Sequence, residues 1–263
     1  NVEQNAPIQS STVQNLINQA EDLLTKDPKN IIMARDLLNE ALIEPMTETQ
    51  HEKIRNRLTE LSEKWLFSRT IYPEDPLCQV YRVKPGDLLS KIGDRYKVPY
   101  QILMTINNLS SARSLRANAP IKVINGPFHA RIYKSKFRMD LYLQNTYVKS
   151  FPVGIGRKGH DTPTGRWVVE SDGKLISPPW TDPDTLKRYE AEDPDYPLGS
   201  RWIGLEGLSG AAKGREGFAI HGTKDPQEIG AAVSRGCIRL HNGNAILVYN
   251  MLMPGESLVD IVE

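Results

Sequence analysis

One cysteine in this chain lies in a setting that suits chemistry better than packing. Cys237 follows a glycine in the stretch SRGCIRLHN (residues 234–242), and Arg235 and Arg239 stand two residues to either side of it. A cysteine that only fills space usually sits among aliphatic residues. Cationic neighbours stabilise a thiolate, which is the reactive form of the side chain. The stretch therefore predicts a cysteine nucleophile.

A histidine sixteen residues upstream suits this nucleophile as a partner. His221 and Gly222 close the stretch FAIHG, at the end of an expected strand. A cysteine nucleophile needs an imidazole that takes its proton and later returns it to a leaving amine. It also needs backbone N–H groups directed at the developing oxyanion, and Gly236 leaves room for that approach. These residues predict a Cys–His acyl-transfer site, with a half-buried free thiol beside a structural histidine as the competing interpretation.

Two other chemistries fit the same residues less well. His221, Cys237 and His241 offer zinc ligands, but no fourth ligand and no short paired motif accompanies them. Papain-like and NlpC-like cysteine peptidases place the cysteine before the histidine, whereas His221 comes first here. We therefore expect acyl transfer that uses neither a metal ion nor an organic cofactor.

Composition limits the possible partners of the chain. Its 263 residues include 33 Lys and Arg against 32 Asp and Glu, a net charge of +1 with the basic residues scattered. No charged surface is available to hold a nucleic-acid backbone. No apolar run approaches the roughly 18 to 20 residues of a membrane helix, so we expect no membrane span. The sequence starts at Asn1 rather than Met, and we expect that a signal peptide or anchor has been removed.

Residues 1–76 predict a small helical segment followed by a linker. Apolar residues recur at three- and four-residue spacing from residue 11 to about residue 70. Thr47 to Gln50 fit a capping box that opens the third of these helices. The proline-containing stretch IYPEDP (71–76) forms the linker. We expect the segment to serve spacing or docking rather than chemistry.

Residues 77–126 predict a strand, two helices and a closing strand. This order and the pattern VYRVKPGDLLSKIGDRYKVPYQILMTINNL resemble the LysM (lysin motif) carbohydrate-binding module. The resemblance implies binding of N-acetylglucosamine-containing glycan in a shallow groove between the loops 86–90 and 107–109. The alternative is that Asp87 and Asn107 only cap the two helices. The candidate glycan-binding residues are Gly86, Asp87, Leu88, Asn107 and Asn108.

Residues 127–263 predict a mainly-β domain. Apolar and polar residues alternate in short runs broken by turn residues, which is typical of antiparallel strands in a sandwich or barrel-like domain. The stretch AILVYNML near the end predicts one helix. An insertion at 171–200 holds five of the 18 prolines, and so long an excursion between strands predicts a functional lid.

The same half of the chain resembles L,D-transpeptidase catalytic domains of the YkuD type. The motif IHG followed by SRGCIRLHN carries the resemblance, and the stretches TPTG, PPW and PLGSRWIGL support it. The fold class implied for the whole chain is multidomain α+β. It comprises a helical N-terminal segment, a βααβ LysM module and a mainly-β L,D-transpeptidase domain.

The resemblance also implies roles for individual residues. Cys237 corresponds to the nucleophile and His221 to the general base and acid. The backbone carbonyl of Gly222 would orient the imidazole, and the N–H groups around Gly236 and Cys237 would form the oxyanion hole. The candidate substrate-binding residues are Arg239, Ser234, Arg235, Trp180 and Tyr196.

The activity implied by this family is 3→3 cross-linking of peptidoglycan. The cysteine is acylated by a stem tetrapeptide, D-alanine leaves, and an amine of a neighbouring stem resolves the thioester. Hydrolysis by the same acyl-enzyme (an L,D-carboxypeptidase), attachment of a protein to the wall, and a non-catalytic peptidoglycan-binding protein remain open as alternatives. The family further implies acylation by carbapenem-type β-lactams and an extracytoplasmic location in the periplasm or cell wall.

Overall fold

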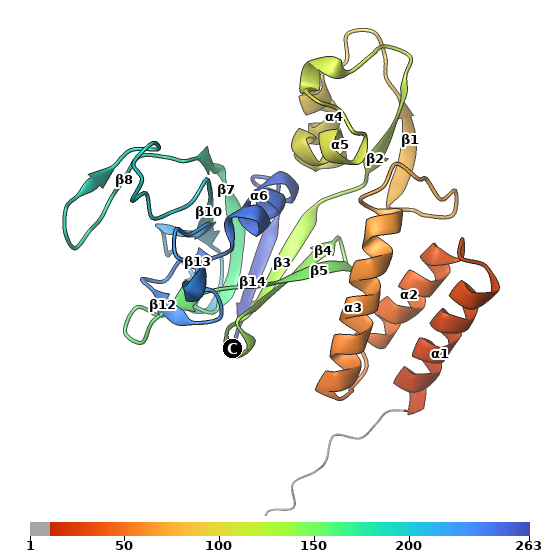
Figure 1. The fold of residues 1–263 in the computed structure, drawn as a ribbon, viewed down its shortest axis with the longest axis horizontal. Helices are drawn as coiled ribbons and strands as arrows, with labels where there is room; N and C mark the ends of the chain where they lie inside the picture. Colours follow the sequence, from red (N-terminus) through yellow and green to blue (C-terminus); the bar gives the residue numbers. More distant parts are fainter. Residues whose placement is uncertain (1–10) are drawn as a thin grey trace, which may run out of the picture.

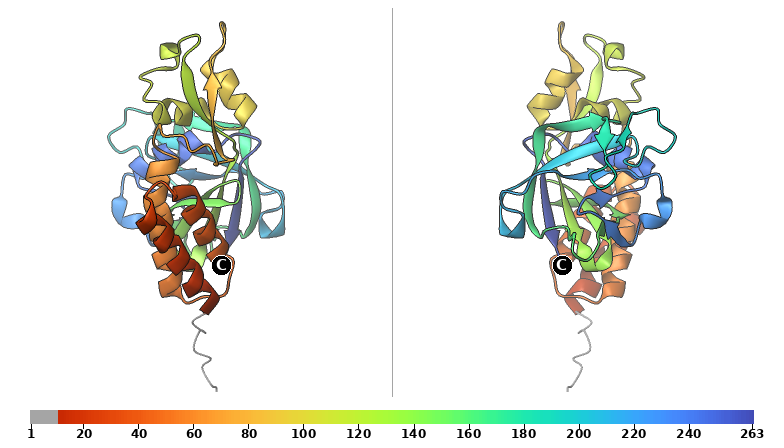
Figure 2. Two further views of the ribbon diagram at one scale, coloured as in Figure 1. Left: turned by 90° about the vertical axis from the view of Figure 1, so that its right-hand side faces the viewer. Right: turned by 90° about the vertical axis from the view of Figure 1, so that its left-hand side faces the viewer.

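The computed structural model describes residues 11–263, which form three units in the order expected from the sequence. Figure 1 shows the helices α1–α3 at one end, the β-rich domain at the other, and the LysM-like module above them. The two side views place the helical segment and the β8 region on opposite sides of the molecule (Figure 2). The predicted multidomain α+β organisation is confirmed.

The N-terminal unit consists of three amphipathic helices: α1 (Ser11–Lys26), α2 (Ile31–Ala41) and α3 (Glu48–Trp65). The capping box predicted at the start of α3 is present. The Thr47 hydroxyl accepts the Gln50 N–H at 3.2 Å, and the Gln50 side chain accepts the Thr47 N–H at 3.1 Å. These two bonds satisfy backbone groups that a helix start leaves without intrahelical partners.

The LysM-like module has the predicted βααβ order: β1 (Cys78–Arg82), α4 (Leu89–Tyr96), α5 (Tyr100–Ile106) and β2 (Pro120–Ile124). Strands β1 and β2 pair antiparallel, so the two ends of the module lie together. Pro99 precedes α5 and marks the expected break between the two helices.

The C-terminal unit is a β half-barrel built on one mixed sheet. Its elements are β3 (Phe128–Tyr133), β4 (Arg138–Leu143), β5 (Thr146–Pro152), β6 (Ile155–Gly156), β7 (Gly165–Ile176), β8 (Trp180–Thr181), β9 (Arg188–Tyr189), β10 (Arg201–Gly207), β11 (Phe218–His221), β12 (Ala232–Ser234), β13 (Ile238–Arg239), α6 (Asn242–Met251) and β14 (Leu258–Val262). Eight strands form the main sheet, in the order β13-β11-β10-β7-β14-β3-β4-β5. The strands that carry the predicted nucleophile and histidine therefore lie at one edge, and β5 forms the other edge.

Helices α2 and α3 cover the β5 edge of this sheet. The backbone N–H of Tyr147 in β5 donates to the side-chain oxygen of Asn39 in α2, at 2.7 Å. Lys149 of β5 pairs with Glu63 of α3 at 2.9 Å. An uncovered edge strand exposes unpaired backbone groups that invite pairing with another chain. The helical segment thus closes the end of the sheet that lies far from the predicted site.

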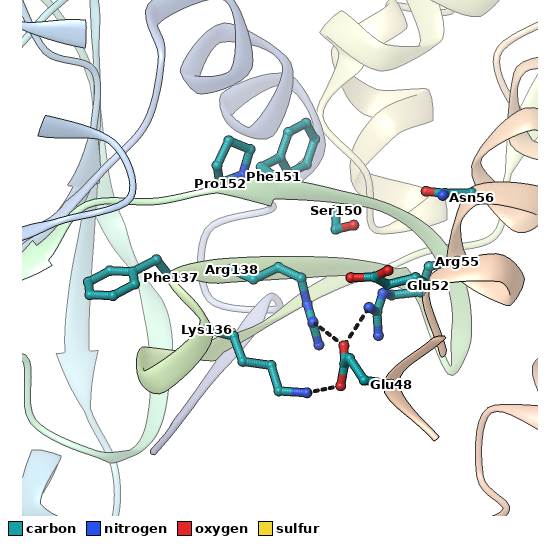
Figure 3. Close-up of a pocket in the computed structure, with 10 residues that line it drawn as sticks. All are labelled: Glu48, Glu52, Arg55, Asn56, Lys136, Phe137, Arg138, Ser150, Phe151 and Pro152. Carbon is teal, nitrogen blue, oxygen red and sulfur yellow. Dashed lines mark hydrogen bonds and ion pairs between the residues drawn. The ribbon is translucent and has the colours of Figure 1, made fainter. Parts of the chain in front are cut away.

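An ionic cluster joins the start of α3 to the strands of the β-domain (Figure 3). The Glu48 carboxylate pairs with Arg55 at 2.9 Å, with Arg138 at 3.5 Å, and with Lys136. The hydrogen bond from Lys136 is the main reason that the pKa of Glu48 falls to about 2. The carboxylate therefore stays charged in neutral and mildly acidic solution, and it keeps all three cations together at this interface.

A buried lysine joins the LysM-like module to the helical segment. Lys122 of β2 points its ammonium at the end of α3, where it donates to the carbonyls of Trp65, Ser68 (3.1 Å) and Thr70 (2.7 Å). Carbonyls at a helix C-terminus lack intrahelical partners and carry partial negative charge. One side chain thus satisfies three acceptors and fixes the module against α3.

A second buried contact strengthens the same junction. The Arg35 guanidinium of α2 pairs with Asp75 of the linker at 2.9 Å and lies 4.5 Å from the centre of the Trp65 ring. On the other side of the module, α5 contacts α6, and Lys97 pairs with Glu256 of the β-domain at 3.0 Å. The module is therefore held from both sides.

We expect Lys122→Met to destabilise the protein by about 2–3 kcal/mol, because a buried charged donor is lost and three carbonyls are left without it. Urea unfolding followed by circular dichroism measures this change. Lys91→Met, at an exposed lysine paired with Asp94, is the matched control and should be nearly neutral. Equal unfolding midpoints for the two variants would contradict the structural role of Lys122.

Candidate active site

Strand pairing brings Cys237 and His221 to the same pocket. Strands β11 and β13 are parallel, with Ile220 beside Ile238 and His221 beside Arg239. Cys237 directly precedes β13, so the same register places it beside Ala219, two residues before His221. Residues two apart on a strand face the same side of the sheet. Both side chains accordingly line one cavity of about 640 Å³.

The imidazole of His221 is buried, oriented and neutral. Its Nδ1 lies 2.6 Å from the carbonyl oxygen of Gly222, which confirms the predicted contact. Because a carbonyl only accepts, Nδ1 carries the proton of the neutral ring and Nε2 carries the lone pair. The Trp202 ring stacks on the imidazole at 5.6 Å and 12°. Burial is the main reason that the pKa of His221 falls to about 4, so at neutral pH the ring is in its base form.

The thiol of Cys237 is protonated at rest, which corrects the interpretation drawn from its basic neighbours. Burial raises the pKa of Cys237, and the Ala219 backbone and Arg239 offset this only in part. The cationic neighbours are already paired: Arg235 contacts Asp182, and Arg239 contacts Glu228. The basic neighbours therefore do not hold Cys237 as a thiolate.

The loop before the nucleophile is fixed by side-chain hydroxyls. The Ser234 hydroxyl donates to the Cys237 carbonyl at 2.6 Å and accepts the Gly236 N–H at 3.1 Å. The Thr162 hydroxyl donates to the Gly236 carbonyl at 2.8 Å and accepts the N–H of Gly156 at 2.9 Å. Ser234 thus shapes the turn from a buried position. The Gly236 N–H is therefore already bonded within the protein and is not free to donate to an oxyanion.

Gly236 is required by the backbone as well as by the approach of a substrate. Its φ of +116° lies in a region that side chains rarely adopt, and a Cβ would lie 2.7 Å from the Phe218 ring. The Phe218 ring is held in turn by the buried Trp167, at 5.1 Å between centroids. The nucleophile loop therefore packs directly on the sheet.

The insertion predicted as a lid forms a hairpin over the pocket. Strand β7 continues to Ile176, so the excursion is shorter than the sequence suggested. Strands β8 and β9 pair, and Trp180 stacks on Tyr189 at 6.0 Å, with both rings lining the pocket. The Arg235 guanidinium pairs with Asp182 at 3.3 Å and with Asp184, which ties the hairpin to the nucleophile loop.

Two of the predicted substrate-binding residues have other partners in the structure. Tyr196 is buried and outside the pocket lining, and its hydroxyl donates to the Pro178 carbonyl at 2.6 Å, so it packs the base of the hairpin. Arg239 lines the pocket but pairs with Glu228, whose other carboxylate oxygen accepts the Thr223 hydroxyl at 2.7 Å. Arg239 therefore stabilises the wall of the pocket through its ion pair with Glu228.

Asn242 is a positioning residue that the sequence analysis missed. Its side-chain oxygen accepts the Thr223 N–H at 3.1 Å, and its amide donates to the Thr223 carbonyl at 3.0 Å. A Cβ on Gly199 or Gly222 would lie 2.1 Å from that oxygen. The asparagine ends the quoted motif SRGCIRLHN, and its place at the start of a helix beside a catalytic motif was the available signal. His241, next to it, is exposed.

The LysM-like module uses two of its candidate residues internally. Asn107 is buried: its amide donates to the carbonyls of Leu103 and Lys122, and its oxygen accepts the Lys122 N–H. The polar groups of this side chain are therefore engaged within the module, where they join α5 to β2. Asp87 accepts the Tyr81 hydroxyl at 2.7 Å and the Lys84 N–H at 2.8 Å, so it braces the turn and does not cap α4.

The remaining candidates of the module are accessible but do not share one cavity. Gly86, Leu88 and Asn108 are exposed. Asn108 borders a cavity of about 390 Å³ that Arg69 also lines, whereas residues 86–88 lie outside that lining.

Neither a metal cluster nor a membrane span is found in the part of the chain that the structure describes. Residues 11–263 contain no group of three or more His, Cys, Asp or Glu side chains placed to hold a metal ion. Within the same residues, no helix combines the length and apolar character needed to cross a bilayer. Cys78 and Cys237 are both free, and Cys78 is buried.

The fold and the Cys–His pocket agree with comparisons to known protein families. The L,D-transpeptidase catalytic domain family (YkuD) matches residues 127–261, and the LysM domain family matches residues 81–123. The chain therefore belongs to the YkuD family of L,D-transpeptidases and carries a LysM domain N-terminal to the catalytic domain.

Curated relatives cover much of the chain. A putative L,D-transpeptidase YkuD of Bacillus licheniformis is 27% identical over 69% of this chain and 98% of its own length. The Bacillus subtilis protein of that name is 29% identical over 66% of this chain and 94% of its own. A probable L,D-transpeptidase ErfK/SrfK of Escherichia coli is 34% identical over 44% of this chain and 37% of its own length.

Solved structures resemble the chain more distantly. An L,D-transpeptidase from Mycobacterium tuberculosis has a TM-score of 0.42 at 19% identity, over 56% of this chain and 63% of that one. A second enzyme from that organism, solved with a faropenem-derived adduct, has a TM-score of 0.41 at 18% identity, over 56% and 65%. The chain thus spans somewhat less than two thirds of these structures.

The protonated resting state of Cys237 predicts slow alkylation at neutral pH. Since the thiolate is the form that reacts with iodoacetamide, we expect a rate below that of free cysteine at pH 8, and one that still rises above pH 9. Mass spectrometry of the intact protein over time measures this rate. Cys78, whose pKa burial raises to about 12, is the internal control and should stay unlabelled in the folded protein. A rate of alkylation that already levels off at pH 7 would contradict a protonated Cys237 thiol at neutral pH.

Proposed function

We propose that the protein is an L,D-transpeptidase that forms 3→3 peptidoglycan cross-links through an acyl-enzyme on Cys237. One observation carries the proposal: the imidazole of His221, anchored through Nδ1, lines the same pocket as the Cys237 side chain. Family membership supports the reaction class. The alternative of a structural histidine beside an inert thiol does not account for an anchored, neutral imidazole and a partly exposed cysteine that line one pocket.

The geometry supports a proton-coupled attack. As the sulfur attacks the carbonyl at the L-centre of the third stem residue, Nε2 of His221 takes the thiol proton. The Gly222 carbonyl stabilises the imidazolium that forms, and the Cys237 N–H faces the oxyanion. Collapse of the tetrahedral intermediate breaks the bond to D-alanine, whose amine receives the proton from Nε2. The product of this half-reaction is a thioester on Cys237.

The second half-reaction reverses these roles. A side-chain amine of a neighbouring stem attacks the thioester, and His221 accepts its proton and returns one to the departing sulfur. Trp180 and Tyr189 form the aromatic wall under which the acyl chain lies. Their hairpin limits the access of water, which favours an amine acceptor over hydrolysis.

The proposal also includes glycan binding by the LysM domain and acylation of Cys237 by β-lactams. The LysM domain would hold N-acetylglucosamine-containing glycan through its exposed loops, which include Gly86, Leu88 and Asn108. Such a substrate requires an extracytoplasmic site of action in the periplasm or cell wall. Carbapenems would acylate Cys237; a relative from this family has been solved in complex with imipenem.

The decisive experiment incubates the purified chain with disaccharide-tetrapeptides and analyses the muropeptides by mass spectrometry. We expect a 3→3 dimer and free D-alanine from the wild type and neither product from Cys237→Ala. The His221→Asn variant should form the dimer at least about 100-fold more slowly than the wild type. Cys78→Ala is the matched cysteine control and should retain activity. A trimmed tripeptide without dimer would show that hydrolysis is the activity; unchanged substrate with every variant would indicate a non-catalytic binder.

Gly236→Ala should slow acylation by imipenem by about 100-fold, because relieving the contact with Phe218 displaces the nucleophile loop. Intact-mass measurement of the imipenem adduct over time gives the rate. Gly214→Ala is the matched control, since Gly214 also has a positive φ (+69°) but open space around its Cβ position. Equal adduct rates in the two variants would mean that Gly236 does not position the sulfur.

A further inference from the structure

Four cationic side chains line the proposed catalytic pocket, and three of them already have acidic partners. Arg239 pairs with Glu228, and Arg235 pairs with Asp182 and Asp184. Lys224 contacts Asp195 at 3.3 Å. The cations of the pocket are Arg157, Lys224, Arg235 and Arg239. A substrate carboxylate that used any of the three paired cations would have to displace an acid of the protein.

Arg157 is the exception. Its side chain is exposed at the pocket, and among residues 11–263 no carboxylate lies within ion-pairing distance of its guanidinium. Unpaired guanidinium groups bind carboxylates through two parallel hydrogen bonds. The position is therefore open to an anion that comes from outside the protein.

The backbone of Arg157 is fixed relative to the nucleophile, although its side chain is free. Its N–H donates to the Ser234 carbonyl at 2.9 Å, three residues before Cys237. The preceding residue, Gly156, is tied through the Thr162 hydroxyl to the Gly236 carbonyl. Short links thus connect the base of this arginine to both sides of the turn that presents the sulfur.

We propose that Arg157 binds a carboxylate of the peptide substrate next to the scissile carbonyl. The inference rests on the proposed function and names the part of the substrate that the pocket recognises. Arg239, the residue to which the sequence analysis gave this role, is paired with Glu228 and braces the wall of the pocket. The unpaired arginine takes the role because it need not break an existing ion pair.

Two carboxylates of a stem tetrapeptide lie close to the attacked carbonyl. One is the C-terminal carboxylate of the leaving D-alanine, and the other is the side-chain carboxylate that a diamino acid at the third position carries. Both offer the same planar acceptor to a guanidinium. A substrate amidated at one of these groups removes that acceptor and leaves the other, so amidated peptides distinguish the two sources.

The test measures binding separately from turnover. Isothermal titration of the tetrapeptide into Cys237→Ala protein gives a dissociation constant that does not depend on catalysis. We expect Arg157→Gln in this background to weaken binding roughly tenfold or more, with Arg157→Lys intermediate because it keeps the charge but not the fork. Amidation of the contacted carboxylate should weaken binding by the same factor to the Cys237→Ala protein that keeps Arg157. The amidated peptide should then bind equally to the proteins with and without Arg157→Gln.

Lys158→Gln is the matched control, because Lys158 is an adjacent exposed cation outside the pocket lining. Equal dissociation constants for Arg157→Gln and Lys158→Gln would overturn the proposal. A difference between these variants that persists with both amidated peptides would overturn it as well. Failure of the proposed function is recognised separately, as an absence of cross-linked or trimmed products from the wild type even where the peptide binds in an Arg157-dependent manner.

Discussion

The hydrogen bond between Nδ1 of His221 and the Gly222 carbonyl is the constraint on which the chemistry of this protein depends. It fixes the tautomer, so that the other ring nitrogen is free to take a proton. That carbonyl is held in place because the Asn242 side chain clamps the next residue and packs on Gly222 itself. The imidazole at the end of β11 is thus positioned by the first residue of α6, which follows it in sequence by 21 residues.

Charge around the pocket is largely neutralised within the protein. Carboxylates of the hairpin and of the loop before β12 hold Arg235 and Arg239, and burial keeps both the thiol and the imidazole uncharged. An uncharged pair avoids the cost of desolvating two ions in an empty site. In the proposed mechanism the thiolate and imidazolium form only when a substrate is bound. The empty site then holds no thiolate that could be oxidised.

The sequence alone predicted those features that short motifs encode. The order of helices and strands, the capping box at Thr47 and the contact of His221 with its neighbouring carbonyl all depend on residues close together in the chain. Features that depend on long-range partners were missed. The inward turn of Asn107 requires β2 beside α5, and the pairing of Arg235 with Asp182 joins residues more than fifty positions apart. Local spacing carries no information about either contact.

The junction around Lys122 and Trp65 has a geometric consequence for an enzyme of a meshwork polymer. Helices α2 and α3 contact both the far edge of the sheet and the LysM domain or its linker, so side-chain contacts as well as the linker connect that domain to the catalytic domain. A wall strand seated on the module would meet the nucleophile at one set separation and angle. The proposed transpeptidase would then select stem peptides by their distance from the bound glycan as well as by their chemistry.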